Sequence, residues 1–173
     1  VNNNVAGDGF RLGAFASASG TVTLNGGTLE VAYVAQGAGS GSFNFNGGTL
    51  KAASNHDGTN AFMSGLGTAT VLSGGAVIDT NGNAADVLIP QSLLDGGGGG
   101  GLTKNGLGTL VLSGTSAYTG ATVVNAGTLV VNGALSGTSG VSVLTGGAIG
   151  GTGSIAGSLT LGSGAQLTFD PSN

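Results

Sequence analysis

One phrase recurs along the chain: a stretch in which apolar and polar residues alternate, then a glycine step, then a second alternating stretch. Alternation with a period of two residues is typical of a strand with one apolar face. A unit of about 20 residues cannot bury that face alone, so its repetition predicts units that stack on one another. The copies are TVTLNGGTLEV from Thr21, SFNFNGGTLKA from Ser42, TVLSGGAVID from Thr70 and TVVNAGTLVV from Thr122, with looser copies SVLTGGAIGG from Ser142 and SLTLGSGAQLTF from Ser158.

Alignment on the glycine step predicts which residues stack. The long gap between Val77 and Leu129 fits two units, so a further strand is predicted near Leu102 or, alternatively, near Leu110. Leu129 is predicted to point into the core. The predicted ladder is Leu29, Leu50, Val77, Leu129, Ile149 and Leu167, and a parallel set on the preceding stretch is Leu24, Phe45, Leu72, Val124 and Leu144.

The fold class predicted from this ladder is all-β, a right-handed parallel β-helix (β-solenoid) of about seven rungs. Stacking at about 4.8 Å per rung would bury one continuous apolar core. An antiparallel sandwich is the competing fold, because Asn-Gly pairs such as Asn25-Gly26 and Asn46-Gly47 are also hairpin signals. Apolar residues stacked at matching phase favour the solenoid.

Composition supports many short strands joined by tight turns. The chain has 39 glycines among 173 residues and only 6% charged residues. Collagen is excluded because glycine lacks a three-residue period and proline is scarce, and disorder fits poorly with 39% hydrophobic residues. The run Gly96–Gly101 is predicted to form a corner between two rungs. The insertion Ser163-Gly164-Ala165 in the last copy is predicted to be a bulge or a shifted corner.

Charge limits the classes of partner. The net charge is −4 and the cations are Arg11, Lys51 and Lys104, so the basic footprint needed for nucleic acid is missing. No apolar run approaches the roughly 18 residues of a membrane-spanning helix, so this segment is not expected to insert into a membrane. The absence of cysteine excludes disulfides and thiolate metal sites. Because the sequence starts at Val1, any export signal is expected to lie outside it.

Residues Gly101–Gly133 read GLTKNGLGTLVLSGTSAYTGATVVNAGTLVVNG. This stretch resembles the autotransporter-associated β-strand repeat, also called the passenger-associated transport repeat. The pieces that carry the resemblance are Gly-Leu-Thr-Lys (101–104), Gly-Thr-Leu-Val-Leu-Ser-Gly (108–114), Tyr-Thr-Gly (118–120) and Gly-Thr-Leu-Val-Val-Asn-Gly (127–133). The upstream Val77–Asn83 resembles the lead-in of the family, whereas Ser116-Ala117 stands where the family often has an Asn.

The resemblance implies a passenger of a large bacterial surface protein, located outside the cell or on its surface, whose repeats aid folding during export. It supplies no catalytic residues. The expected function is therefore a structural stalk or passenger scaffold, with an adhesin or a self-assembling extracellular fibre as the alternative. The whole of 1–173 is expected to be one solenoid segment, divided into divergent rungs (1–95), the glycine corner (96–101), the signature repeat (101–133) and the C-terminal rungs (134–173).

Two stretches resemble sites without meeting the requirements of one. His56, the single histidine, precedes Asp57 in the loop SNHDGTN, and the two are expected to be an exposed pair without a nucleophile. Alternating oxygens in Asp79–Asp86 could ligate Ca²⁺, but the glycine at position six and the distal Glu of an EF-hand are missing. A turn capped by Asx side chains is the expected structure there.

Other candidate residues also favour structural roles. Lys104 lacks the Gly-Lys-Ser/Thr context of a phosphate loop and is expected to point outward or to neutralise Asp95. Tyr33 and Tyr118 are expected to pack at strand ends. The few basic groups and the 5% aromatic content argue against a polysaccharide lyase. The sequence thus predicts no enzyme, and no catalytic, cofactor-binding or metal-binding residue.

The expected partners follow from the ends of the stack. Neither Val1–Val5 nor Leu167–Phe169 shows a polar cap, and uncapped strand edges can pair with another chain. We expect self-association through the end rungs, and a host or neighbouring-cell surface is the second expected class of partner.

Overall fold

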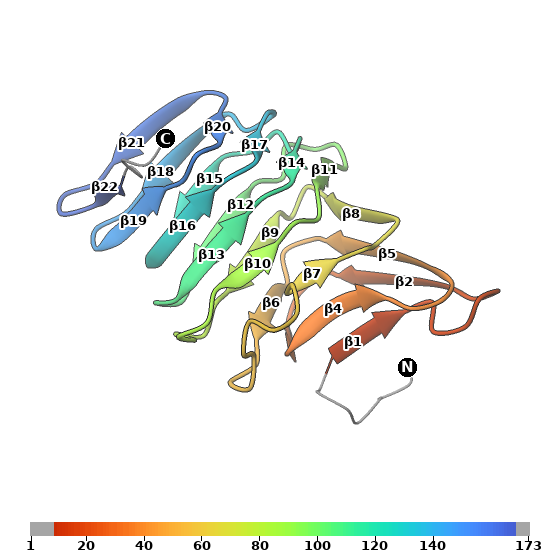
Figure 1. The fold of residues 1–173 in the computed structure, drawn as a ribbon. Coiled ribbons are helices and arrows are strands. Elements are labelled where there is room, and N and C mark those ends of the chain that lie inside the picture. Colours follow the sequence, from red (N-terminus) through yellow and green to blue (C-terminus); the bar gives the residue numbers. More distant parts are fainter. Residues whose placement is uncertain (1–8, 169–173) are drawn as a thin grey trace.

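The computed structural model describes residues 9–168, which form 22 strands joined by turns and loops. The strands lie on three faces of an elongated stack, and the chain visits the faces in the order 1, 2, 3 (Figure 1). We call one circuit of three strands a rung. Seven rungs are complete and β22 begins an eighth, which agrees with the predicted number.

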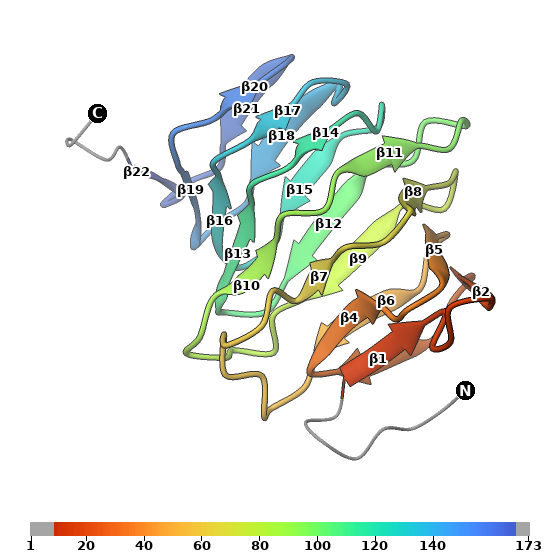
Figure 2. The same cartoon turned by 45° about the vertical axis from the view of Figure 1, so that its right-hand side comes forward.

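The strands of each face follow one another along the stack (Figure 2). Face 1 contains β1 (Gly9–Leu12), β4 (Tyr33–Gln36), β7 (Met63–Ser64), β10 (Val87–Ile89), β13 (Thr109–Leu112), β16 (Gly127–Val131), β19 (Gly147–Gly150) and β22 (Gln166–Thr168). Face 2 contains β2 (Ser19–Leu24), β5 (Ser40–Phe45), β8 (Thr68–Val71), β11 (Leu93–Asp95), β14 (Thr115–Ser116), β17 (Ala134–Leu135) and β20 (Ser154–Ile155). Face 3 contains β3 (Thr28–Val31), β6 (Thr49–Ala52), β9 (Ala76–Asp79), β12 (Leu102–Asn105), β15 (Thr122–Val124), β18 (Gly140–Val143) and β21 (Ser158–Leu161).

Pairing between rungs is parallel throughout the described chain, so the fold is a parallel β-solenoid and the antiparallel sandwich is wrong. Face 3 is one continuous sheet of seven strands. The sheets of the other faces are interrupted, between β7 and β10 on face 1 and between β11 and β14 on face 2. Single backbone bonds cross these gaps, from Phe62 N to Leu88 O (2.7 Å) and from Ala117 N to Leu93 O (2.8 Å).

The structure divides the predicted apolar ladder into two ladders that lie on different faces. On face 3, Leu29 pairs with Leu50 and Leu50 with Ile78, so the predicted Val77 is displaced by one residue and points outward. On face 1, the prediction holds within the C-terminal half, where Leu129 pairs with Ile149 and Ile149 with Leu167.

The two ladders arise because the same phrase occurs at different corners. In the first half, the glycine step joins face 2 to face 3, as at 25–27 between β2 and β3. In the second half it joins face 3 to face 1, as at 125–126 between β15 and β16. The phrase specifies a strand, a tight corner and a strand, but it does not specify which corner of the triangle. Leu102 and Leu110, the alternatives for the missing strand, therefore both lie in strands, on faces 3 and 1.

The parallel set also divides between faces. Leu24 pairs with Phe45 as predicted, but Phe45 pairs with Val71 rather than with Leu72. Val124 lies on face 3, and Leu144 is an exposed corner residue.

The core is the column of inward side chains between the three faces. Leu129 is fully buried, as predicted, and so are most inward residues of the central rungs. Phe43 and Phe45, two residues apart on β5, both point inward with ring centroids 4.7 Å apart. One cation, Lys104, occupies an inward position between Ile78 and Val124 of the neighbouring rungs.

Rungs differ in length along the stack. In the first half, one circuit leads from Thr49 to its partner Val77. In the second half the circuits are shorter, since Thr122 pairs with Val141 and Gly140 pairs with Ser158. The extra residues of the first half lie mainly in two loops, 53–62 between β6 and β7 and 80–86 between β9 and β10.

The glycine run Gly96–Gly101 lies at the corner between β11 and β12. Gly97, Gly98 and Gly99 have φ of 79°, 84° and 72°, which side chains rarely adopt. Neighbouring rungs hold the end of the run, because Gly101 O accepts a hydrogen bond from Ala76 N (2.8 Å). A Cβ at Gly100 would collide with the carbonyl oxygen of Leu72. The run therefore has one fixed path and needs glycine to follow it.

The ends of the stack are open in the described chain. Ser163-Gly164-Ala165 forms part of the corner between β21 and β22, in agreement with a shifted corner. Of the predicted end material, Leu167 lies in β22, whereas Val1–Val5 and Phe169 lie outside the described residues. Among residues 9–168, no helix has the length and hydropathy needed to cross a membrane.

Candidate functional site

The two longest connections between strands, 53–62 and 80–86, occupy consecutive rungs at the corner between faces 3 and 1. They project together at the lower left of Figure 1. Loops inserted on one side of a repeat architecture are frequently its binding side. We call this pair the loop corner, and it is the candidate functional site.

His56 anchors the loop corner and is buried, with 6% of its surface exposed. Its Nδ1 lies 2.8 Å from Ala32 O and its Nε2 lies 3.1 Å from Asp86 O. The ring also packs edge-on against Phe62, with centroids 5.5 Å apart. The expectation of an exposed histidine was wrong because the loop folds back and places the imidazole between the backbones of the preceding and following rungs.

Both hydrogen-bond partners of His56 are carbonyl oxygens. A neutral imidazole donates from one nitrogen only, whereas the protonated ring donates from both. Asp57 takes no part in this arrangement, since it is exposed and accepts a hydrogen bond from Thr59 N at 2.9 Å. That hydrogen bond is the main cause of the lowered pKa of Asp57. The two residues thus do not form an acid–base pair.

The two loops also bind each other directly. Asn83 Nδ2 donates to Ala53 O at 3.1 Å, and Gly58 lies against Ala85. The loop corner is consequently one stacked unit.

The stretch Asp79–Asp86 forms the predicted Asx turn. Asn81 N donates to Asp79 Oδ1 at 2.7 Å, and Asn81 has a left-handed φ of 53°. Asn83 N closes the turn by donating to Thr80 O at 3.0 Å. Across residues 9–168, no three His, Cys, Asp or Glu side chains are grouped in a way that could hold a metal ion.

Lys104 is a second buried polar centre, on the rung that follows the loop corner. Its Nζ donates to Gly106 O (2.7 Å), Asn105 O (3.0 Å) and Ala126 O (3.0 Å) and lies 3.1 Å from Thr80 Oγ1. These acceptors belong to three successive corners between faces 3 and 1. The ammonium therefore fastens three rungs together.

Both expectations for Lys104 were wrong. The side chain points inward and is fully buried, and Asp95 instead accepts a hydrogen bond from Thr119 Oγ1 at 3.2 Å. Burial lowers the pKa of Lys104 to about 8, and the charge of Asp79 acts in the opposite direction. An outward lysine is the ordinary case because isolated buried charges are costly. Here main-chain carbonyls at the corners supply the missing partners.

Tyr118 forms a third buried polar centre, near the corner between faces 2 and 3. Its hydroxyl lies 2.7 Å from Thr122 Oγ1, which lies 3.2 Å from Thr138 Oγ1. Thr138 Oγ1 in turn lies 2.8 Å from Gly120 O. Burial raises the pKa of Tyr118 to about 12, partly offset by the hydrogen bond from Thr122. Tyr118 is a packing residue, as predicted.

The remaining cations bind neighbours on their own faces. Arg11 Nη2 donates to Tyr33 Oη at 3.1 Å, and its guanidinium lies 5.4 Å from the centre of the Tyr33 ring. Lys51 pairs with Glu30 across β3 and β6, with Nζ 3.2 Å from Oε2. Each of these cations thus connects two consecutive rungs from the outside of the stack.

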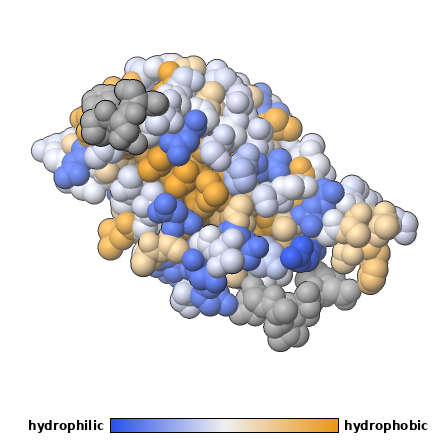
Figure 3. Space-filling model, viewed as in Figure 1, coloured by the Kyte–Doolittle hydropathy of each residue, from blue (hydrophilic) through white to orange (hydrophobic). Residues whose placement is uncertain are grey.

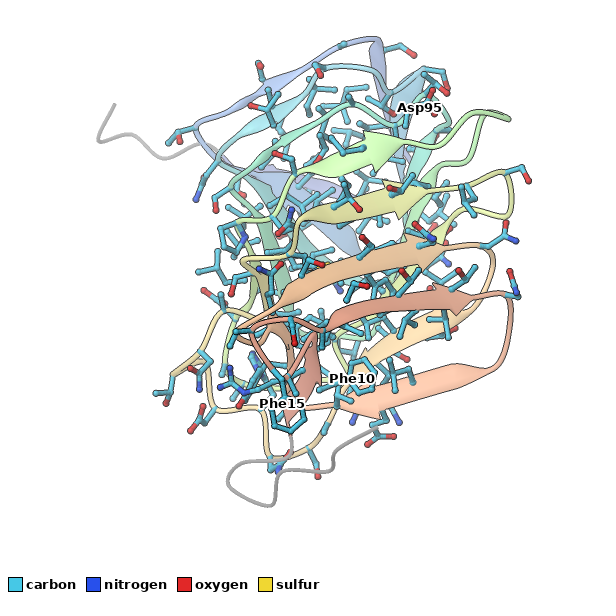
Figure 4. The ribbon with its side chains drawn as sticks, turned by 90° about the vertical axis from the view of Figure 1, so that its right-hand side faces the viewer. Phe10, Phe15 and Asp95 are labelled. Carbon is cyan, nitrogen blue, oxygen red and sulfur yellow. The ribbon has the colours of Figure 1, made fainter. Side chains whose placement is uncertain are left out.

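An apolar groove of about 420 Å³ lies at the first rung, between β1, β2 and the loop 13–18. Phe10 and Phe15 line it (Figure 4), and Phe15 is 67% exposed. The loop projects at the right of Figure 1, where the surface is hydrophobic in Figure 3. The groove is the open end of the described stack, and no carboxylate or histidine is among the described residues that line it.

Two comparisons with known protein sequences give a match, one with a repeat family and one with a single relative. The sequence model of the passenger-associated transport repeat matches residues 10–31 and 102–131. The chain is similar to the adhesin BmaC autotransporter of Brucella suis biovar 1 (strain 1330), with 34% identity over 115 residues. That match covers 61% of this chain but 3% of the relative. No solved structure matches the chain.

The match at 102–131 confirms the signature predicted from the sequence. The match at 10–31 was missed, because this copy has no counterpart of Lys104 or Tyr118. The signal that could have found it is the phrase Thr21–Val31, which resembles Thr122–Val131. In the structure, the glycine steps of these two copies occupy different corners.

Proposed function

We propose that this chain is a stalk segment of a secreted bacterial surface protein, whose repeats promote folding of the passenger during export, because two of its segments match the passenger-associated transport repeat. The family and the relative support a location among the autotransporter passengers of the cell surface. The chain spans 3% of that relative, so the role within a whole protein is part of the proposal.

The observation that carries the proposal is the burial of the signature residues. Lys104 and Tyr118 are the least common residue types in the signature, and both are 1% exposed or less. Lys104 connects successive rungs directly, and Tyr118 does so through the hydroxyls of Thr122 and Thr138, so neither presents chemistry to solvent. A motif of this kind favours addition of one rung to the next, which is how a repeat chain propagates its fold.

The chain serves as a scaffold and not as an enzyme. Support comes from the partners of its buried polar groups, which are main-chain carbonyls and amides, hydroxyls and the Lys104 ammonium. In the part of the chain that the structure describes, each buried side-chain nitrogen or oxygen has a hydrogen-bond partner. A nucleophile adjoining a general base, which covalent catalysis would need, is not among these pairs.

Surface display tests the folding role. We would fuse the chain to a translocator barrel and measure the protease-resistant passenger on the cell surface. Lys104→Ala should reduce display strongly, since it removes the group that fastens three corners. Lys51→Ala is the matched control, because Lys51 lies on the same face but points outward. Equal display of the two variants would contradict the role.

A second candidate function is head-to-tail assembly. It is favoured by the last rungs, where Leu159, Leu161 and Leu167 are 39%, 41% and 40% exposed, and by the apolar groove at the first rung. Strands β3 and β21 are the two edges of the same parallel sheet, so copies could continue it. Light scattering over a concentration series should show growth that Leu161→Asp abolishes. A monomer at all concentrations would exclude assembly.

Adhesion is the function that the name of the relative suggests. We propose the loop corner as the part of this chain that contacts a host or neighbouring-cell surface. Its two loops are the longest connections between strands within residues 9–168. Binding of cells to the purified chain, compared with a variant in which 53–62 is shortened, would test it. Undiminished binding by the shortened variant would exclude the loop corner.

A further inference from the structure

The described chain contains five Asn-Gly pairs: Asn25-Gly26, Asn46-Gly47, Asn81-Gly82, Asn105-Gly106 and Asn132-Gly133. An Asn followed by Gly is the sequence most prone to spontaneous loss of the side-chain amide. Glycine lacks a Cβ, so its backbone nitrogen can approach the preceding side chain without a clash. The five pairs share this local chemistry, but the structure places them differently.

Four of the pairs have a side chain bound to the next rung. Asn46 Nδ2 donates to Asn25 Oδ1 at 2.8 Å, and Gly74 N donates to Asn46 Oδ1 at 3.0 Å. In the second half, Asn125 Nδ2 donates to Asn105 Oδ1 at 2.7 Å. Asn132 Oδ1 accepts from Thr152 N at 3.3 Å. These contacts keep each side-chain carbonyl directed along the stack and away from its own backbone.

Asn81-Gly82 differs from the other four pairs in its asparagine side chain, which no neighbouring rung of the described chain holds. Both residues are exposed, and the Asn81 side chain has no hydrogen bond to any residue from 9 to 168. The Gly82 amide likewise donates no bond within this described range. Apart from Gly82 itself and its two chain neighbours, no described residue has an atom within 4 Å of the position that a Gly82 Cβ would take, so the space beside the pair is open.

We propose that Asn81 is a site of spontaneous deamidation, and that it reacts before the other four Asn-Gly pairs. The Gly82 amide loses its proton to water or hydroxide, and its nitrogen attacks Asn81 Cγ. The new N–Cγ bond forms as the Cγ–Nδ2 bond breaks, and ammonia leaves a cyclic imide. Water then opens the imide. Attack at the side-chain carbonyl carbon Cγ breaks the N–Cγ bond and gives aspartate, whereas attack at the main-chain carbonyl carbon breaks the other C–N bond and gives isoaspartate. The net reaction exchanges ammonia for water and needs no oxidant or cofactor.

Deamidation would alter the loop corner. The product adds a carboxylate beside Asp79, whose Oδ1 already accepts the Asn81 amide proton. The isoaspartate form also inserts one carbon into the backbone of the turn 80–86. Asp86, at the end of that turn, supplies the carbonyl oxygen that binds His56 Nε2. The modification therefore loosens the contact between the two loops and makes the loop corner more acidic.

The test compares deamidation of the folded and urea-unfolded chain, with each Asn-Gly pair quantified by peptide mass spectrometry over time. In the unfolded chain all five sites should react at rates within about threefold, because tertiary contacts are gone. In the folded chain Asn81 should react at least about tenfold faster than each other site, the factor of one hydrogen bond of typical net strength. Equal protection of Asn81 and Asn25, or earlier conversion of any other pair, would overturn the proposal.

Two variants locate the early product. Asn81→Gln should abolish it, since a longer side chain forms the ring far more slowly. Asn25→Gln, which removes another exposed Asn-Gly pair, should leave it unchanged. If the early product persists in Asn81→Gln, the proposal is wrong. Protease cleavage at 53–62 should rise as Asn81 converts, and should remain constant in Asn81→Gln.

Discussion

The two halves of this solenoid are held together by different means. In the first half two consecutive rungs are long because they carry the loops 53–62 and 80–86, and His56 connects this loop corner to the rungs on either side. In the second half the rungs are shorter. There Lys104 connects three successive corners from inside the stack, and Tyr118 connects two through Thr122 and Thr138. The comparison indicates that a buried polar side chain can hold an irregular corner in place, as His56 does, or can strengthen regular corners, as Lys104 does. Of these buried polar residues, Lys104 and Tyr118 belong to the signature repeat 101–133, whereas His56 does not.

The largest expected effect is on the core that both halves share. Leu129→Asp places an unpaired carboxylate in the fully buried ladder of face 1 and should cost about 4 kcal/mol or more, or prevent folding. Circular dichroism during thermal unfolding measures this. Leu107→Asp is the control, because Leu107 is 80% exposed and its substitution should be near neutral. Equal melting of both variants and wild type would show that the inward face is assigned wrongly.

The second prediction concerns the half that contains the signature. Lys104→Ala removes the ammonium donor from the carbonyl oxygens of Gly106 and Ala126 and leaves a cavity in the ladder, so it should reduce the free energy of unfolding by about 3 kcal/mol. Lys51→Ala removes a surface pair and should change it by less than about 0.5 kcal/mol. Urea titration of both variants measures the difference. If the two variants lower the free energy of unfolding equally, the buried Lys104 has no stabilising role beyond that of a surface lysine.

The third prediction concerns the other half. His56→Ala removes the ring whose two nitrogens contact the carbonyl oxygens of Ala32 and Asp86, and it should cost about 2 kcal/mol at most, confined to the loop corner. Limited proteolysis should cut 53–62 faster, while the rungs after Leu102 keep their resistance. Faster cutting throughout the chain would instead show that the halves unfold as one unit.

The last prediction concerns the pH dependence of the free energy of unfolding. The folded pKa of Lys104, about 8, lies below the ordinary value of about 10.4 in an unfolded chain. Between these values the unfolded chain binds more protons, so the free energy of unfolding should rise with pH. Tyr118 has the opposite effect above about pH 10, where the unfolded tyrosine ionises first. Lys104→Met should abolish the rise while retaining the later fall, and Tyr118→Phe should show the reverse.

The sequence was sufficient to predict the strands, the parallel stack and the inward position of Leu129, since these depend on a period of two residues and on the repeat. It could not identify the corner that a glycine step occupies, because the phrase at Thr21 and at Thr122 is locally the same. It also misplaced Lys104 and His56. Their partners include the main-chain carbonyls of Ala126 and Asp86, which are distant in the sequence, and carbonyls leave no pattern in a sequence.

The buried polar centres at Lys104 and Tyr118 should make the signature rungs the most stable part of the stack. Native-state hydrogen exchange measured by mass spectrometry tests it directly. The account predicts that amides of 102–143 exchange last, that 53–62 and 80–86 exchange early, and that Lys104→Ala removes most of the protection of 102–143. Uniform protection along 9–168, or latest exchange in the first half, would contradict it.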